Sequence, residues 1–69
     1  MTSETVTDVA ELLLPYGRQA TLKNVEFDGG LNMLRLTLRE GRRFTIIDLD
    51  AASAADLGTQ LIGWAETRK

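Results

Sequence analysis

Apolar and polar residues alternate along LNMLRLTLR, residues 31–39, and again along RFTII, residues 43–47. Successive side chains of a β-strand point to opposite faces of a sheet, so a period of two is typical of strands with one buried face. In the first segment the side chains that share one face are Leu34, Leu36 and Leu38. The side chains of Arg35 and Arg39 share the other face. Much of the chain is therefore committed to an antiparallel sheet.

The preceding segment, QATLKNVEF, changes parity halfway along its length. Ala20 and Leu22 would point to one face, whereas Val25 and Phe27 would point to the other. A β-bulge inserts one extra residue and restores a common face. We therefore predict a bulge at Lys23–Asn24.

The turns between these segments predict how the strands pair. A hairpin closed by Gly29–Gly30 sets Val25 opposite Leu34 and, beyond the bulge, Leu22 opposite Leu36. A three-residue loop, Glu40–Arg42, sets Leu38 opposite Phe44, although its glycine lies one place earlier than such a loop prefers. The prediction is a three-stranded antiparallel meander over residues 18–28, 31–39 and 43–48.

Two other segments show the helical period. In TVTDVAELLL, apolar residues recur at Val6, Val9, Ala10 and Leu13, and Pro15 would end a helix. We predict a short N-terminal helix over residues 6–14, with an extended segment through the three leucines as the alternative.

The C-terminal segment has the most regular helical pattern in the chain. From residue 51 to residue 67, one side of a helix would carry the apolar residues Ala51, Ala54, Leu57, Gly58, Leu61, Ile62, Trp64 and Ala65. Asp50 is the expected N-cap. The predicted fold class is α+β, with this helix packed on the inner face of the meander.

The length of 69 residues predicts one domain, residues 1–69, made of an acidic N-terminal segment (residues 1–16) and a core (residues 17–67). Chains of this size lie near the lower limit for a self-sufficient apolar core and often depend on disulfides, metals or a partner. The chain has no cysteine and no histidine. We therefore expect a homodimer.

The sequence contains no feature of secretion or membrane insertion. The start, MTSETVTDVAE, lacks a basic region followed by an apolar run, and no segment is long and apolar enough to cross a bilayer. We expect a cytoplasmic protein with no membrane partner.

Catalysis is not expected from this composition, because histidine and cysteine, the usual base and the strongest nucleophile, are both absent. Asp48 and Asp50 resemble the paired aspartates that bind metal ions at strand ends. A helix cap at Asp50 explains the pair more simply. We predict no catalytic, cofactor-binding or metal-binding residues, and keep a small enzyme only as an alternative.

Charge is segregated along the chain although the net charge is only −2. Residues 17–47 carry six basic side chains, Arg18, Lys23, Arg35, Arg39, Arg42 and Arg43. The predicted register places Arg35, Arg39 and Arg43 on the outer sheet face, beside Ile47. Like charges directly opposite each other repel. We therefore predict that these four residues bind a partner.

Three readings of this basic face remain open. It is a solvated surface, it binds the acidic N-terminal segment within the chain or in a dimer, or it binds an external acidic protein or a nucleic acid. The predicted function is a small non-catalytic protein-interaction module. Nucleic-acid binding through the same arginines is the alternative, although the outer face offers no aromatic side chain for base stacking.

The pattern PYGR…LRLTLREGRRFTIIDLD, with the downstream glycine and WA, resembles a family of small proteobacterial proteins of unknown function. The resemblance covers residues 13–65, and its most specific part is LREGRRFTIIDLD with Gly58 and Trp64. It implies a bacterial cytoplasmic protein, and it implies no catalytic or binding residue.

Overall fold

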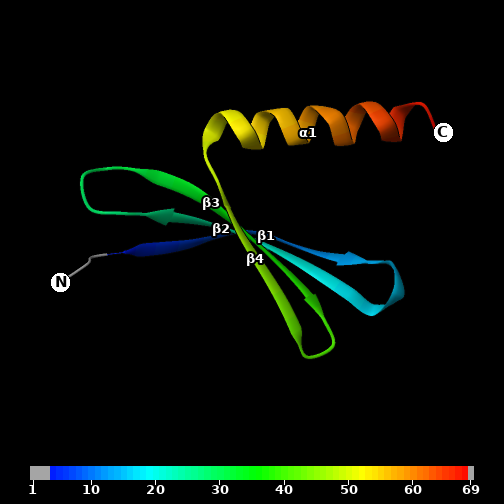
Figure 1. Cartoon of the computed structure of the whole chain (residues 1–69), viewed down its shortest axis with the longest axis horizontal. Helices are drawn as coiled ribbons and strands as arrows, with labels where there is room; N and C mark the ends of the chain where they lie inside the picture. Colours follow the sequence, from blue (N-terminus) through cyan, green and yellow to red (C-terminus); the bar gives the residue numbers. More distant parts are fainter. Residues whose placement is uncertain (1–3, 69) are drawn as a thin grey trace.

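The structure, a computed structural model, describes residues 4–68. Four strands form one antiparallel sheet in chain order: β1 (Thr5–Leu14), β2 (Arg18–Glu26), β3 (Asn32–Glu40) and β4 (Arg43–Leu49). The α-helix α1 (Ala51–Glu66) follows β4 (Figure 1). The α+β class is thus confirmed, with a meander of four strands rather than three.

The predicted N-terminal helix over residues 6–14 is wrong, because this segment is the edge strand β1. It begins with Thr5, Val6 and Thr7, and β-branched side chains of this kind lose rotamer freedom in a helix but fit a pleated strand. Along its length β1 also pairs with the backbone of β2. Without β1, the strand β2 would be an open edge of the sheet. Strand pairing therefore prevails over the helical spacing of four apolar residues.

The predicted bulge at Lys23–Asn24 is also wrong, and Val25 lies opposite Met33 rather than Leu34. The pairing of Leu22 with Leu36 is confirmed. The first hairpin has a loop one residue longer than predicted, and the Phe27 N–H donates a hydrogen bond to the Leu31 carbonyl across it (2.8 Å). This longer loop lets the β2–β3 ladder run without interruption. The sheet has its bulge in β1 instead, between Asp8 and Ala10.

The second hairpin is shorter than predicted, and this changes the orientation of every side chain in β4. Glu40 pairs with Arg43, so the loop is only Gly41–Arg42. Gly41 has φ +60°, and a glycine at positive φ in the first loop position is the pattern of a type II′ turn. A shift of one residue moves a whole strand's side chains to the opposite face. Leu36 consequently lies opposite Ile47 rather than Ile46.

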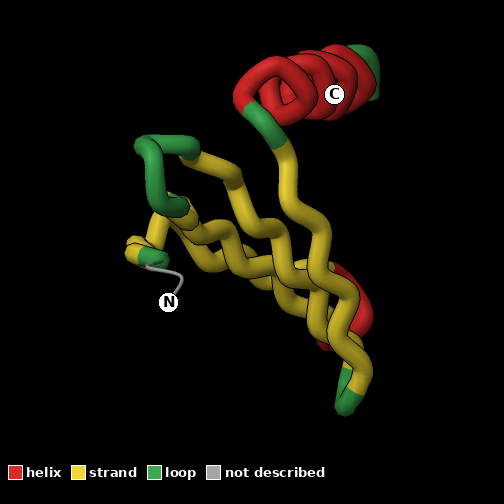
Figure 2. The backbone as a smooth tube through the Cα atoms, turned by 60° about the vertical axis from the view of Figure 1, so that its left-hand side comes forward, coloured by secondary structure: helices red, strands yellow, loops and turns green. Residues whose placement is uncertain are grey.

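The C-terminal helix forms as predicted but does not cover the sheet. It leaves the end of β4 and runs apart from the strands (Figure 1), and a view rotated by 60° shows it beyond the end of β4 (Figure 2). None of its residues is buried. A side chain built at Gly58 would meet open space. The predicted packing of this helix on the inner face of the sheet is therefore wrong within a single chain.

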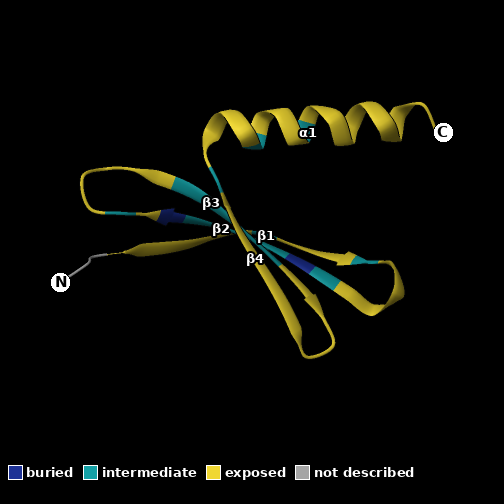
Figure 3. Ribbon diagram, viewed as in Figure 1, coloured by how far each residue is buried: buried dark blue, intermediate teal, exposed yellow. Residues whose placement is uncertain are grey.

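Burial within the chain is correspondingly slight. Among residues 4–68, only Ala20 and Val25 are buried, at 4% and 0% exposure (Figure 3). Both belong to β2, a central strand, and they point to opposite faces because their positions differ by an odd number. One chain thus forms a sheet without a second layer.

The N-cap of α1 provides a test of the strand-to-helix junction. The Ser53 N–H donates a hydrogen bond to the Asp50 carboxylate (2.8 Å), and side-chain and backbone hydrogen bonding from Ser53 lowers the pKa of Asp50. Because the pKa is lowered on folding, this stabilisation is present at pH values above the ordinary aspartate pKa. It is lost as the pH falls through the pKa of Asp50 in the folded protein. We expect Asp50→Ala to reduce the helical circular dichroism signal at neutral pH.

Asp50→Asn is the matched control, because asparagine caps helices well but does not titrate in this range. It should keep the helical signal at neutral pH and lose less of it on acidification than the unmodified chain. Equal acid sensitivity of the two proteins would contradict a role for the Asp50 carboxylate as the cap.

Candidate functional site

The register sorts the side chains of the sheet into two faces of different character. Residues directly opposite each other across an antiparallel ladder point to the same face. One face, here called the leucine face, carries Leu12, Leu14, Ala20, Leu22, Leu34, Leu36, Leu38, Ile47 and Leu49. The other, here called the charged face, carries Asp8, Glu11, Lys23, Arg35, Arg39 and Asp48, together with the apolar residues Val6, Leu13, Val25, Met33, Phe44 and Ile46. The leucine face is therefore the more uniformly apolar of the two, whereas apolar and charged side chains are mixed on the charged face.

The four residues predicted to bind a partner do not lie on one surface. Arg35 and Arg39 are on the charged face, whereas Arg43 and Ile47 are on the leucine face. The residue opposite Arg39 is Phe44, whose ring centroid lies 5.8 Å from the guanidinium carbon. The predicted cluster of like charges is therefore absent, because the second hairpin is one residue shorter than assumed.

Arg35 is neutralised by two carboxylates, one on the neighbouring strand β4 and one just before β1. Its Nε and Nη2 donate hydrogen bonds to the two carboxylate oxygens of Asp48, at 2.9 and 3.0 Å, and Glu4 lies 4.0 Å from its Nη1. The side-chain hydrogen bonding from Arg35 lowers the pKa of Asp48, so Asp48 keeps its negative charge at pH values below the usual aspartate pKa. The charge of Arg35 is therefore already balanced by carboxylates of the same chain.

Asp48 and Asp50 have separate structural roles. Asp48 is held by Arg35 on the charged face, and Asp50 caps the helix, which confirms the capping interpretation. Among residues 4–68 there is no group of three or more acidic, histidine or cysteine side chains that could hold a metal ion.

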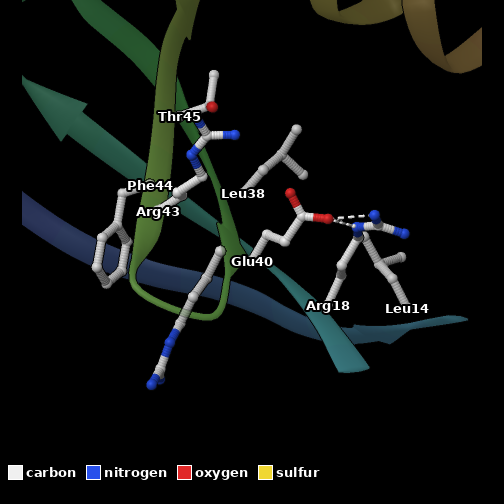
Figure 4. Close-up of a pocket in the computed structure, with 8 residues that line it drawn as sticks. Leu14, Arg18, Leu38, Glu40, Arg43, Phe44 and Thr45 are labelled. Atoms are coloured by element: carbon white, nitrogen blue, oxygen red, sulfur yellow. Dashed lines mark hydrogen bonds and ion pairs between the residues drawn. The ribbon is translucent and has the colours of Figure 1, made fainter. Parts of the chain in front are cut away.

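At one end of the leucine face the surface is hollowed. A depression of about 450 Å³ is lined by residues that include Leu14, Leu38 and Thr45. Arg18 and Glu40 form an ion pair at its rim, and Phe44 points to the other side of β4 (Figure 4). Arg43 also lines the hollow and, within the described part of the chain, makes no ion pair. The hollow is thus lined by both apolar and charged side chains.

The helix carries a second uncovered apolar surface, here called the helix face. Its large side chains are exposed to 42%, 61%, 61% and 62% in the order Leu57, Leu61, Ile62 and Trp64. The guanidinium of Arg68 stacks on the Trp64 ring at 4.8 Å from its centroid. A solvated helix normally exposes polar residues, so four large exposed apolar side chains make the surface of this helix unusually apolar.

The sequence predicted the β2 and β3 part of the leucine face and the apolar side of the helix, but assigned both to the interior of one chain. It placed Phe44 and Ile46, rather than Ile47, on that face. The missed signal is the length of the strand-to-helix connection. Only Asp50 separates β4 from α1, whereas connections of this kind commonly have two to six residues. The leucines of β1 were missed as members of the sheet for a different reason, since their segment was assigned to a helix.

The fold is a four-stranded antiparallel meander with one appended helix, and among its described residues no helix could span a bilayer. A family model covering residues 3–67 matches the chain, which belongs to this family of unknown function, DUF6967. Searches of curated proteins and of solved structures gave no match. The family membership is consistent with the resemblance seen in the sequence and assigns no activity.

The Arg35–Asp48 pair tests the register of the second hairpin. Arg35→Asp and Asp48→Arg each place like charges opposite one another, so each should lower the urea midpoint of unfolding. The double variant restores opposite charges and should recover most of the loss. Arg39→Asp is the control, because Arg39 makes no ion pair among residues 4–68. Absence of recovery in the double variant would contradict the pairing.

Proposed function

We propose that this protein is a small non-catalytic interaction module that works as a homodimer. Its contact surface consists of the leucine face and the helix face. The observation that carries this proposal is the area of apolar surface that one chain leaves open to water. The fold has no second layer in which that surface could be buried.

The size of the excess surface fits an obligate interface. One chain exposes 5714 Å², whereas a compact monomer of this mass exposes about 4,300 Å². The excess for two chains is on the order of 2,800 Å², within the range of 2,000–5,000 Å² that obligate homodimers bury. The radius of gyration, 13.9 Å against about 11 Å for a compact domain of this length, supports the same conclusion.

The arginines give weaker support to a basic binding face. Arg35 and Arg18 are already paired with carboxylates, and Arg39 and Arg43 point to opposite faces. An acidic protein or a nucleic acid would therefore find few available cations on any one face. Catalysis has no support from the side chains present, since the chain contains neither histidine nor cysteine.

Two neighbouring isoleucines form a matched pair for testing this proposal. Ile47 lies on the leucine face and Ile46 on the charged face, with 43% and 60% exposure in one chain. If the leucine face is the interface, Ile47→Lys should weaken self-association by roughly 10- to 100-fold, because burying such a side chain contributes about 1.5–3 kcal/mol. Ile46→Lys should leave it nearly unchanged.

Sedimentation equilibrium measures both variants over a range of concentrations. The unmodified chain should have twice the mass of one 7.6 kDa chain. A monomer at high concentration would refute the proposal. Dissociation by Ile46→Lys but not by Ile47→Lys would move the interface to the charged face.

A further inference from the structure

The leucine face and the helix face could pack against each other because both are apolar, but they do not meet within one chain. Both are apolar, and α1 runs apart from the strands (Figure 1). A helix with one apolar side packs stably on the apolar face of a sheet, and the two layers then share one core. The question is whether the two layers come from one copy or from two.

The junction between β4 and α1 argues against closure within one chain. Leu49 still pairs with Leu34 in the ladder, and the helix begins at Ala51. The single residue between them, Asp50, is extended (φ −80°, ψ 173°) and is held by its hydrogen bond from Ser53. Folding the helix back over its own leucine face requires a reversal of chain direction that one extended residue does not provide. The helix is therefore available to another molecule.

Resting on the homodimer proposed above, we propose that α1 of each copy packs its helix face on the leucine face of the other. This reciprocal arrangement uses the same two surfaces on both copies, as a two-fold dimer requires. It buries both uncovered surfaces in one step. The surface that one chain exposes beyond that of a compact monomer would then be the surface buried between the helix of one copy and the sheet of the other.

Two features of the helix suit a sheet as its partner. Gly58 lies on the same side as Ala51, Ala54 and Ala65, and small residues on that side allow close approach to another backbone. The charged residues of α1, Asp56 and Glu66, lie on the opposite side of the helix, so packing of the helix face buries no carboxylate of the helix.

Cross-linking distinguishes this arrangement from its alternatives, because the chain has no cysteine of its own. One copy carries Leu61→Cys on the helix face, and a second copy, lengthened by a tag, carries Leu36→Cys on the leucine face. The two are unfolded, mixed and refolded together, then treated with a short bismaleimide. The expected product joins the tagged and untagged copies. Ile46→Cys on the charged face of the tagged copy is the control and should give several-fold less product.

Each other outcome overturns the exchange of helices. A bond formed inside single chains of a Leu36→Cys, Leu61→Cys double variant, with none between copies, shows that the helix folds back on its own sheet. Products joining only Leu36→Cys to Leu36→Cys show two leucine faces packed together. A dimer by sedimentation that gives equal product from Leu36→Cys and Ile46→Cys rejects the arrangement while leaving the homodimer intact.

The two helical glycines provide a second test that does not depend on cross-linking. A side chain at either Gly58 or Gly63 meets open space in the single chain, but only Gly58 lies on the apolar side of the helix. Both Gly→Gln changes favour the helix by a similar propensity. Gly58→Gln should raise the dissociation constant at least tenfold, and Gly63→Gln should not. Equal effects of the two changes would contradict packing of the helix face on a sheet.

Discussion

A one-residue connection between the last strand and the helix is the constraint on which the rest of the structure depends. Leu49 ends the β3–β4 ladder, Asp50 caps the helix, and Ala51 is already helical. This junction leaves no chain for a reversal, so the helix projects away from the sheet that it would otherwise cover. The exposure of the apolar face of the sheet, the exposure of the apolar side of the helix and the slight burial in one chain all follow from it.

The alternation of residues predicted the sheet because the strand period is a local property of the chain. Leu34, Leu36 and Leu38 share a face, as their spacing indicates, whereas the pairing of Leu22 with Leu36 was predicted correctly because a loop one residue too short and a bulge that does not form offset each other. Loop length is a different matter, since one residue more or less changes the face of a whole strand. The second hairpin illustrates this, because the early position of Gly41 already favoured the two-residue turn that forms.

The candidate site depended on that same residue of loop length. With a three-residue loop, Arg39 and Arg43 would face each other on one surface. With two, Arg39 lies opposite Phe44, and Arg43 joins the leucine face. Pairing of residues distant in sequence, such as Arg35 with Asp48, and the recruitment of β1 to the sheet are tertiary effects. Local spacing alone does not contain them.

The central claim is that the core of this protein is completed by a second copy. Folding and association are then one equilibrium, and stability depends on protein concentration. The most direct measurement is the urea midpoint of unfolding at concentrations that differ 100-fold. A completed core shared between copies should raise the free energy of unfolding by about 2.7 kcal/mol per dimer over that range, with a clear shift in midpoint. An unchanged midpoint for a fully folded chain would contradict the account.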